Sequence, residues 1–303
     1  MIIIALTEHI GDIVATEPVI SHVKTKWPKS ELVWITFKPY QQLIMHHPQL
    51  HSHLSVSCLT EWIILKKIIS RLAKIYDLHM HLKHCSKYGY VLYNNKYSNI
   101  TYSNFLDEGR SLLKAFSLIA GLGDMEDIRP TFYLNKKIYN PPTPELYIVI
   151  HTKSSSIVKD WDDNKWKSII SYYLQHNSQV KFVEIGLIPL YIDEGPDNYI
   201  NMCCKLNFQQ IALLIRDTLL FIGIDSGFAH IAHALETPKL VLIGALGSFK
   251  TYNPFSGPNK DHGLIKNNGP VKDIDTIVIL NKIDRVLNQR LNNGSSSVVR
   301  KEI

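Results

Sequence analysis

The sequence predicts an α/β protein made of two Rossmann-like domains that face each other across a cleft. Two observations support this fold. Short apolar runs alternate with helical patterns along nearly the whole chain, which is typical of parallel sheets covered by helices. A proline-rich segment then interrupts this alternation near the middle of the 303 residues, and two domains of about 150 residues suit that length.

The first half opens with the apolar run MIIIAL, a helical pattern from about Ile13 to Trp27, and the run ELVWITF. The opening run lacks the basic start and small-residue cleavage site of a signal peptide, so we interpret it as a buried strand. No apolar run approaches the ~20 residues that a membrane-spanning helix needs.

Three prolines mark the boundary between the halves, because proline continues neither a helix nor a central strand: Pro141, Pro142 and Pro144. We place the linker at 139–145 and the domains at 1–142 and 143–303. The second half is predicted to contain strands at 146–151, 180–185, 219–224 and 239–244, with helices near 164–176, 207–217 and 227–235. A C-terminal helix closes this domain. Ligands of such folds bind at the carboxyl ends of the strands, so the cleft is the predicted site.

Composition and charge restrict the class of protein. The content of 45% hydrophobic and 20% charged residues is that of a folded soluble chain. Four cysteines lack metal-ligand spacing and are expected to be reduced thiols of a cytoplasmic protein: Cys58, Cys85, Cys203 and Cys204. Residues 1–142 hold 16 basic and 11 acidic residues, and the remainder holds 17 and 16. The first half therefore either binds an anionic partner or carries an ordinary lysine-rich surface.

The segment FIGIDSGFAHIAHALETP predicts a phosphate site. A strand ending at Ile224 delivers Asp225, Ser226 and Gly227 to the sheet edge, where a helix begins with free N–H groups and a positive dipole end. His230 follows one turn later and is expected to face the same ligand. In the alternative interpretation Asp225 or Ser226 only caps the helix and His230 belongs to the core. The Gly-x-Ser-x-Gly pattern of a hydrolase is absent.

A second polar loop follows the first strand of the same half, in HTKSSSIVKDWDDNKW. Ser154 and Ser155 offer hydroxyl groups and Lys159 offers an ammonium, a combination that suits a diphosphate. The alternative is a polar loop that ends in a helix cap.

In the first half, LTEHIGDIVATEPVI places Asp12 just after a predicted strand. Asp12 is either a helix N-cap or a general base that points across the cleft at the phosphate loops. We expect it to face the second domain across an open, solvent-filled cleft in the free protein.

The segment 60–75, TEWIILKKIISRLAKI, predicts an amphipathic helix. Its apolar residues share one face: Ile64, Ile68, Leu72 and Ile75. Its basic residues cluster on other faces: Lys66, Lys67, Arg71 and Lys74. The helix is an ordinary surface helix, a ledge that binds acceptor phosphates, or a contact with the cytoplasmic membrane surface.

Three segments together resemble glycosyltransferase family 9, the lipopolysaccharide heptosyltransferases: GDIVATEPVI, SSIVKDW and DSGFAHIAHALETP. The resemblance covers roughly residues 1–290. It implies a GT-B fold and an inverting, metal-independent transfer that uses no cofactor. The donor it implies is ADP-heptose, and the acceptor is an anionic, lipid-linked glycan of the lipopolysaccharide or lipooligosaccharide type. We expect a cytoplasmic protein, peripheral to the inner membrane, and no nucleic-acid partner.

The resemblance also implies roles for particular residues. Asp12 is the expected base, and Lys159 stabilises the leaving group. The expected donor-binding residues are Ser154, Ser155, Asp225, Ser226, Gly227 and His230. The candidate acceptor-binding residues are Lys66, Lys67 and Arg71. Relatives often carry a glycine followed by a glutamate after the second strand of this domain. Here Glu184 precedes Gly186 instead, which leaves the donor base and sugar open.

Two alternatives to this function remain. One is a GT-B transferase with a different nucleotide sugar or with a protein or capsule acceptor. The other is a non-catalytic relative that binds a nucleotide sugar.

Overall fold

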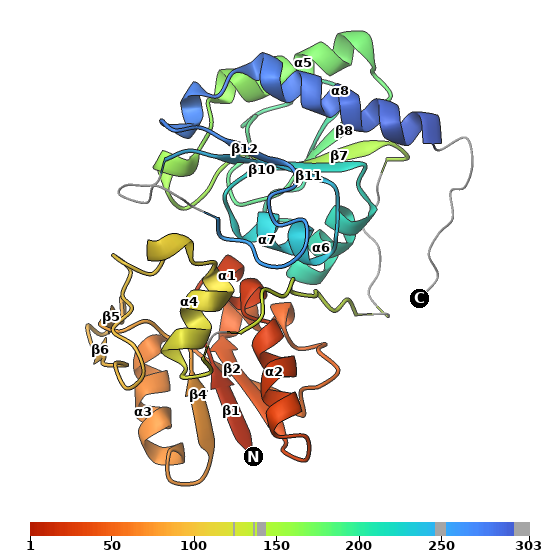
Figure 1. Ribbon diagram of the computed structural model, residues 1–303. Coiled ribbons are helices and arrows are strands. Elements are labelled where there is room, and N and C mark those ends of the chain that lie inside the picture. The colour runs from red at the N-terminus through yellow and green to blue at the C-terminus, as the bar shows by residue number, and fades with distance from the viewer. Residues whose placement is uncertain (124, 136, 138–143, 246–252, 294–303) are drawn as a thin grey trace.

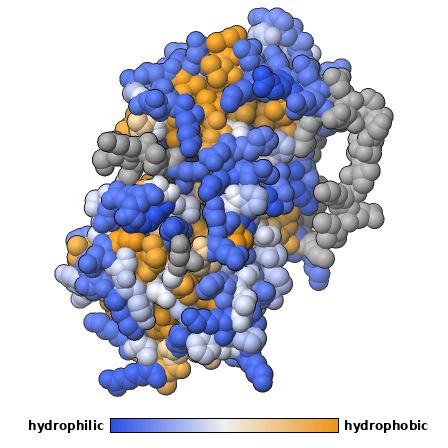
Figure 2. Space-filling model, in the orientation of Figure 1, coloured by the Kyte–Doolittle hydropathy of each residue, from blue (hydrophilic) through white to orange (hydrophobic). Residues whose placement is uncertain are grey.

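The computed structural model has two lobes, each a parallel sheet with helices on both faces (Figure 1). It describes residues 1–123, 125–135, 137, 144–245 and 253–293. The predicted domain boundary at 142 lies outside the described residues. Apolar and hydrophilic residues both appear on the surface of each lobe, and the lobes touch across the middle of the molecule (Figure 2).

The first lobe contains a four-stranded sheet in the order β3-β2-β1-β4, with every pair parallel. The strands are β1 (Ile2–Ala5), β2 (Leu32–Phe37), β3 (Ser52–Val56) and β4 (Lys74–Asp77). Successive side chains of a strand point to opposite faces. Accordingly, Ile2 and Ile4 pack in the core cluster that contains residues of α2 (Pro18–Lys26), whereas Ile3 and Ala5 pack with α3 (Leu59–Ile69).

Two helices of this lobe differ from the prediction. The single helix expected at 13–27 is split into α1 (Ile10–Ala15) and α2, because Pro18 lacks the N–H needed inside a helix and begins a new one. The helix expected at 60–75 ends at Ile69, and Lys74 and Ile75 belong to β4.

The rest of the first lobe follows β4. A short antiparallel hairpin comes first, made of β5 (Lys83–His84) and β6 (Val91–Leu92), and α4 (Leu112–Ile119) comes later. Four 3₁₀ helices complete the description of both lobes: η1 (Lys38–Leu43), η2 (Asp107–Gly109), η3 (Ile157–Lys159) and η4 (Val271–Asp273).

The second lobe contains a six-stranded parallel sheet in the order β12-β11-β10-β7-β8-β9. The strands are β7 (Tyr147–His151), β8 (Lys181–Glu184), β9 (Tyr199–Asn201), β10 (Leu220–Ile224), β11 (Lys239–Ile243) and β12 (Leu264–Lys266). All four predicted strands are confirmed. The edge strands β9 and β12 were not predicted, since three residues are too few to show a pattern.

Helices cover both faces of the second sheet (Figure 1). The outer face carries α5 (Asp163–His176) and α8 (Thr276–Asn293), and the face toward the first lobe carries α6 (Phe208–Asp217) and α7 (Gly227–Ala234). One hydrophobic cluster contains side chains of α1 and α2 together with side chains of α6 and α7, so the core is continuous between the lobes.

Two further sequence expectations concern single features. All four cysteines are free thiols, and three are buried. Among the helices in the described part of the chain, none combines the length and apolar character required to cross a bilayer.

Candidate functional site

The two lobes meet where α1 packs against α7, and two glycines make this contact possible. A Cβ atom on Gly227 would lie 2.5 Å from the Cβ of Ile10, and one on Gly11 would lie 2.8 Å from Cδ2 of His230. Any larger residue at either position forces the helices apart. The expectation of an open, solvent-filled cleft is therefore wrong at this point, because α1 and α7 are already in van der Waals contact.

Asp12 lies on α1, and its side chain is 16% exposed. Its carboxylate accepts a hydrogen bond from the backbone N–H of His9 and lies 3.4 Å from the His9 Nδ1 atom. The contact between the Asp12 carboxylate and the His9 imidazole raises the pKa of His9. The alternative that Asp12 is the N-cap is wrong: His9 is the N-cap residue, and Asp12 is the third residue of the helix.

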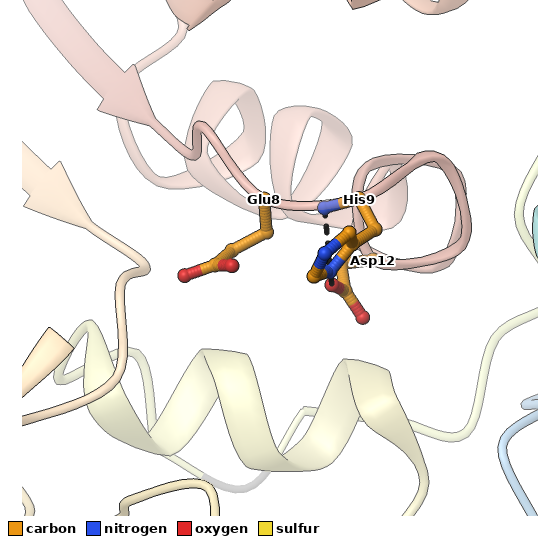
Figure 3. Close-up of side chains that lie close together, drawn as sticks. All are labelled: Glu8, His9 and Asp12. Carbon is orange, nitrogen blue, oxygen red and sulfur yellow. Dashed lines mark hydrogen bonds and ion pairs between the residues drawn. The ribbon is translucent and has the colours of Figure 1, made fainter. Parts of the chain in front are cut away.

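Glu8 adds a second carboxylate beside this pair (Figure 3). It is buried, and its Oε2 atom accepts hydrogen bonds from Lys83 Nζ at 2.7 Å and from the Tyr102 hydroxyl at 2.9 Å. Glu8, His9 and Asp12 each offer one metal-ligand atom, and these atoms lie within 4.8 Å of one another. The Lys83 ammonium, however, already supplies a positive charge at Glu8.

A buried relay connects the end of β1 with the end of β4. The backbone N–H of Thr7 donates to Nε2 of His79 at 2.8 Å, and the Thr7 hydroxyl oxygen lies 2.7 Å from the same atom. The Nδ1 atom of His79 then donates to Asp77, at 2.6 Å. Burial alone would raise the pKa of Asp77, but His79 and Lys66 outweigh burial and hold it at about 2. This relay fixes the two loops from which Glu8, His9 and Lys83 project.

Of the three predicted acceptor residues, Lys66 and Lys67 lie on α3, and Arg71 lies in the turn after it. Lys66 forms an ion pair with Asp77 at 2.6 Å, so its charge is already compensated. Lys67 and Arg71 are exposed. Because α3 begins after the carboxyl end of β3 and leads back to the start of β4, its last residues lie toward the opposite edge of the sheet from Asp12.

In the second lobe, the structure brings two predicted residues together. Lys159 Nζ lies 2.5 Å from Asp225 Oδ2, although 66 residues separate them. The contact arises because β7 and β10 are neighbouring parallel strands, so the loops after both strands leave the same edge. Asp225 is buried, whereas Lys159 is partly exposed. A cation is thereby held at the edge from which α7 starts.

The start of α7 contains buried polar atoms without partners. Ser226 is the N-cap residue, but its hydroxyl makes no capping hydrogen bond and has no other partner among the described residues. Nδ1 of the buried His230 also has no hydrogen-bond partner among the described residues, and burial lowers the pKa of this histidine to about 4. Buried polar atoms usually have hydrogen-bond partners, so this pattern favours a bound ligand over a simple cap.

Ser154 and Ser155 lie in the loop after β7, as predicted. The backbone N–H and hydroxyl of Ser154 donate to the Asp160 carboxylate at 2.8 Å and 3.0 Å, so this serine orders the loop itself. Ser155 is exposed. Their roles in donor binding stay predictions.

Glu184 is a structural carboxylate. It is fully buried and accepts hydrogen bonds from the Thr152 hydroxyl, the Leu190 N–H and the Tyr199 hydroxyl, and burial raises its pKa. All these contacts are inside the second lobe. Both oxygens of the carboxylate are therefore engaged without a ligand.

Several residues of this region were missed by the sequence analysis. In the first lobe these are Glu8, His9, His79, Lys83 and Tyr102. In the second lobe His151 ends β7 and packs edge-on against Phe228 of α7, and burial lowers its pKa to about 3. The available signal was position alone: Glu8, His9 and His151 all follow or end a predicted strand.

A cavity of about 400 Å³ lies beside α7, between the lobes. Its lining includes Lys114 and Asp127 from the first lobe and Phe255 and Lys260 from the second. The Phe255 ring centroid is 4.7 Å from that of His230, so the cavity wall adjoins the predicted phosphate site. The cavity is large enough for part of a sugar nucleotide or acceptor.

Two Rossmann-like lobes joined edge to edge, with a carboxylate at one edge and a lysine and a helix N-terminus at the other, define a GT-B glycosyltransferase architecture. The family model described as glycosyltransferase family 9 (heptosyltransferase) matches residues 68–268. The chain belongs to this family.

The comparisons with individual proteins agree with this assignment. Lipopolysaccharide heptosyltransferase 3 of Escherichia coli K12 is 22% identical over 275 residues, covering 78% of this chain and 80% of that protein. A family 9 glycosyltransferase of Veillonella parvula has a similar fold, with a TM-score of 0.67 and 14% identity over 95% and 97% of the two chains. The structure of Escherichia coli heptosyltransferase WaaC with ADP has a TM-score of 0.63 and 14% identity to this chain, covering 94% of this chain and 99% of that one.

Proposed function

We propose that this glycosyltransferase moves a heptose from ADP-heptose to a lipopolysaccharide- or lipooligosaccharide-type acceptor, with inversion at the anomeric carbon and without a metal or cofactor. Family membership and the likeness to heptosyltransferase 3 support the proposal. Such an acceptor is anionic and lipid-linked, so the enzyme would work at the cytoplasmic face of the inner membrane.

Asp12 acts as the general base in this proposal. It takes the proton from the acceptor hydroxyl while that oxygen attacks the anomeric carbon, and the bond to the nucleoside diphosphate breaks on the opposite side. The electron pair of this bond leaves with the diphosphate. Lys159 and the N-terminus of α7 stabilise the charge that develops there. Ser226 and His230 offer the diphosphate their unpartnered polar atoms.

One observation carries the proposal: the Gly11–Gly227 contact sets the helix of Asp12 directly against the helix that begins at the predicted phosphate site. A base from one lobe and a leaving-group site from the other are needed side by side for transfer, since reacting atoms must approach to about 3–3.5 Å.

The test combines binding with product analysis. Isothermal titration with ADP, GDP and UDP identifies the nucleotide, and incubation of ADP-heptose with heptose-deficient lipooligosaccharide should raise the acceptor mass by one heptose. Nuclear magnetic resonance of the product reads the anomeric configuration, and a rate unchanged by a chelator supports metal independence. No nucleotide binding and no mass increase would reject the proposal.

A different nucleotide sugar, or a protein or capsule acceptor, is the second candidate. The arrangement after β8 favours it, because Glu184 precedes Gly186 and is hydrogen-bonded within the lobe. The nearest acidic residues after this glycine, Asp193 and Glu194, are both exposed. Tighter binding of GDP or UDP than of ADP would select this candidate. A non-catalytic relative would bind a nucleotide and transfer nothing.

A further inference from the structure

The outward side of α3 exposes an aliphatic stripe. Ile64 and Ile68, one helical turn apart on α3, are 56% and 63% exposed, and Leu72, in the turn that follows the helix, is 79% exposed. Lys67 on α3 and Arg71 in the same turn are also exposed. We call these five residues the α3 flank. Of the four residues predicted to share an apolar face, Ile64 and Ile68 lie on α3 and Leu72 in the turn after it, whereas Ile75 belongs to β4.

Trp62 explains the orientation of the helix. Its side chain is fully buried beneath α3, and its indole N–H donates to Asp77 at 3.2 Å. Burying one tryptophan removes more apolar surface from water than burying an isoleucine, so the helix turns its Trp62 face inward. The aliphatic stripe is left in water as a result.

The β5–β6 hairpin extends this surface. Cys85 and Leu92 of the hairpin segment are buried in the same cluster as Trp62, so hairpin and helix lie side by side (Figure 1). Four tyrosines in and after the hairpin are exposed: Tyr88, Tyr90, Tyr93 and Tyr97.

The charge of the whole molecule is concentrated here. Residues 62–106 contain seven lysines and arginines and a single acid, Asp77, which is buried and paired. The net charge of this segment therefore equals the +6 of the entire chain, and all other residues together are neutral.

We propose that the α3 flank and the adjoining hairpin dock on an anionic phospholipid bilayer. Exposed aliphatic side chains enter the boundary between head groups and acyl chains, tyrosines favour the same interface, and basic residues are attracted by anionic lipids. A soluble polyanion would not need the aliphatic stripe. A second copy of the chain would bring two surfaces of like charge together.

The location of this surface is compatible with transfer to a lipid-linked glycan. α3 runs along the side of the first sheet, so a membrane that covers it does not cover the edge where Asp12 lies. The docking inference goes beyond the proposed function, and vesicle binding tests it without any reaction.

The experiment is vesicle co-sedimentation of the full chain with phosphatidylglycerol–phosphatidylethanolamine vesicles and with phosphatidylcholine vesicles. One variant replaces the stripe (I64S/I68S/L72S), and another reverses the charge (K67E/R71E). The control for the stripe variant is I277S/V278S on α8, where both residues are exposed. The control for the charge reversal is K26E/K29E, at and just after the end of α2 on the other face of the first sheet. Thermal unfolding of every variant verifies that it is folded.

We expect salt-sensitive binding to the anionic vesicles and little to phosphatidylcholine. Each basic residue near an anionic surface strengthens binding roughly fivefold, so K67E/R71E should weaken it at least about 25-fold. The stripe variant should weaken it about tenfold or more. The controls and D12N should bind like the wild type.

Three results would overturn the docking proposal: no binding to anionic vesicles at low salt, equal losses in the controls, or full binding by the stripe variant. The last result would show that charge alone carries the binding and that the aliphatic stripe does not enter the bilayer. Because D12N still reports on binding, failure of the transferase proposal and failure of docking are distinguishable.

Discussion

The segments that follow β1 and β10 meet where α1 packs against α7, yet the chemistry of the two sheet edges differs. At the first edge the carboxylates of Asp12, Glu8 and Asp77 bond to His9, Lys83 and His79, and the Oε1 atom of Glu8 is buried without a partner among the described residues. At the second edge, one ion pair is accompanied by buried polar atoms that have no partner among the described residues, on Ser226, His230 and His151.

This difference indicates a division of labour. A partnered carboxylate is held in a fixed position, which suits proton transfer. Buried polar atoms without partners are stabilised when a ligand supplies the missing hydrogen bonds. The histidines follow the same division, since hydrogen bonding raises the pKa of His9 while burial lowers that of His230.

The strongest test removes the proposed base at the first edge. Asp12→Asn should lower turnover by ~10²–10⁴-fold, the usual contribution of a positioned base, and leave the affinity for nucleoside diphosphate nearly unchanged. Steady-state rates and calorimetry measure both quantities. Glu8→Gln is the comparison, because Glu8 lies beside Asp12 but is engaged by Lys83. A larger loss of turnover in Glu8→Gln would transfer the role of base to Glu8.

Acid should destabilise the second edge through its neutral histidines. Burial lowers the pKa values of His230 and His233 to about 4, whereas an unfolded histidine titrates near 6.5. The unfolded chain binds the extra protons between these values. The contribution of these two histidines to the free energy of unfolding is therefore fully present above pH 6.5. Below that pH it falls by about 1.4 kcal/mol for each histidine and each pH unit, down to pH 4.

Urea unfolding between pH 7.5 and 4.5 measures this slope. Protonation of carboxylates at other positions also lowers the free energy of unfolding in acid. The comparison is therefore with His233→Gln, in which the slope of this free energy against pH should be smaller. His9 contributes in the opposite sense: its raised pKa adds stability that is present below 6.5 and is lost as pH rises through the folded value. An identical slope in His233→Gln contradicts the assignment of a neutral buried histidine.

The cation of the second edge is tested by Lys159→Ala. We expect the affinity for nucleoside diphosphate to fall about 10–100-fold, because a charge-assisted contact is lost, and Lys159→Arg to recover little of it. Lys153→Ala is the matched control, since Lys153 also forms an ion pair in the same loop, with Asp163 at 2.5 Å. Equal affinity losses in both variants would mean that Lys159 only orders the loop.

The smallest expected effect concerns the contact between the edges. Gly227→Ala places a methyl group against Ile10 and should lower the free energy of unfolding by about 1–3 kcal/mol. Gly269→Ala is the control, because a Cβ there meets its neighbours at ordinary distances of 3.5 Å and more. Small-angle scattering should show a larger radius of gyration only for Gly227→Ala. Unchanged scattering and stability would show that the lobes adjust freely.

The sequence predicted the architecture well because the second lobe repeats strong patterns. Its long helices and buried strands show clear periodicity and clear ends, as in α5 and β10. Prediction was weaker where tertiary structure decides. Pro18 splits a helix whose apolar pattern continues, and Trp62 rather than Ile64 or Ile68 occupies the buried side of α3.

The candidate site shows the same limit. Asp12, Lys159 and Asp225 were identifiable because each follows a predicted strand. Their partners were not identifiable, since Glu8 bonds to residues 75 and 94 positions away, and only the folded chain brings these side chains together. The closed Gly11–Gly227 contact was also unpredictable, because it joins two sheets whose relative placement no local pattern encodes.

The concentration of the net charge in residues 62–106 has a physical consequence beyond attraction. A neutral body with a basic segment on one flank has a large electric dipole moment. In the field above a negatively charged surface such a molecule experiences a torque, so it rotates to present that flank before contact. At low ionic strength a larger fraction of its collisions with the surface therefore occurs in the binding orientation. High salt screens the field and removes this gain.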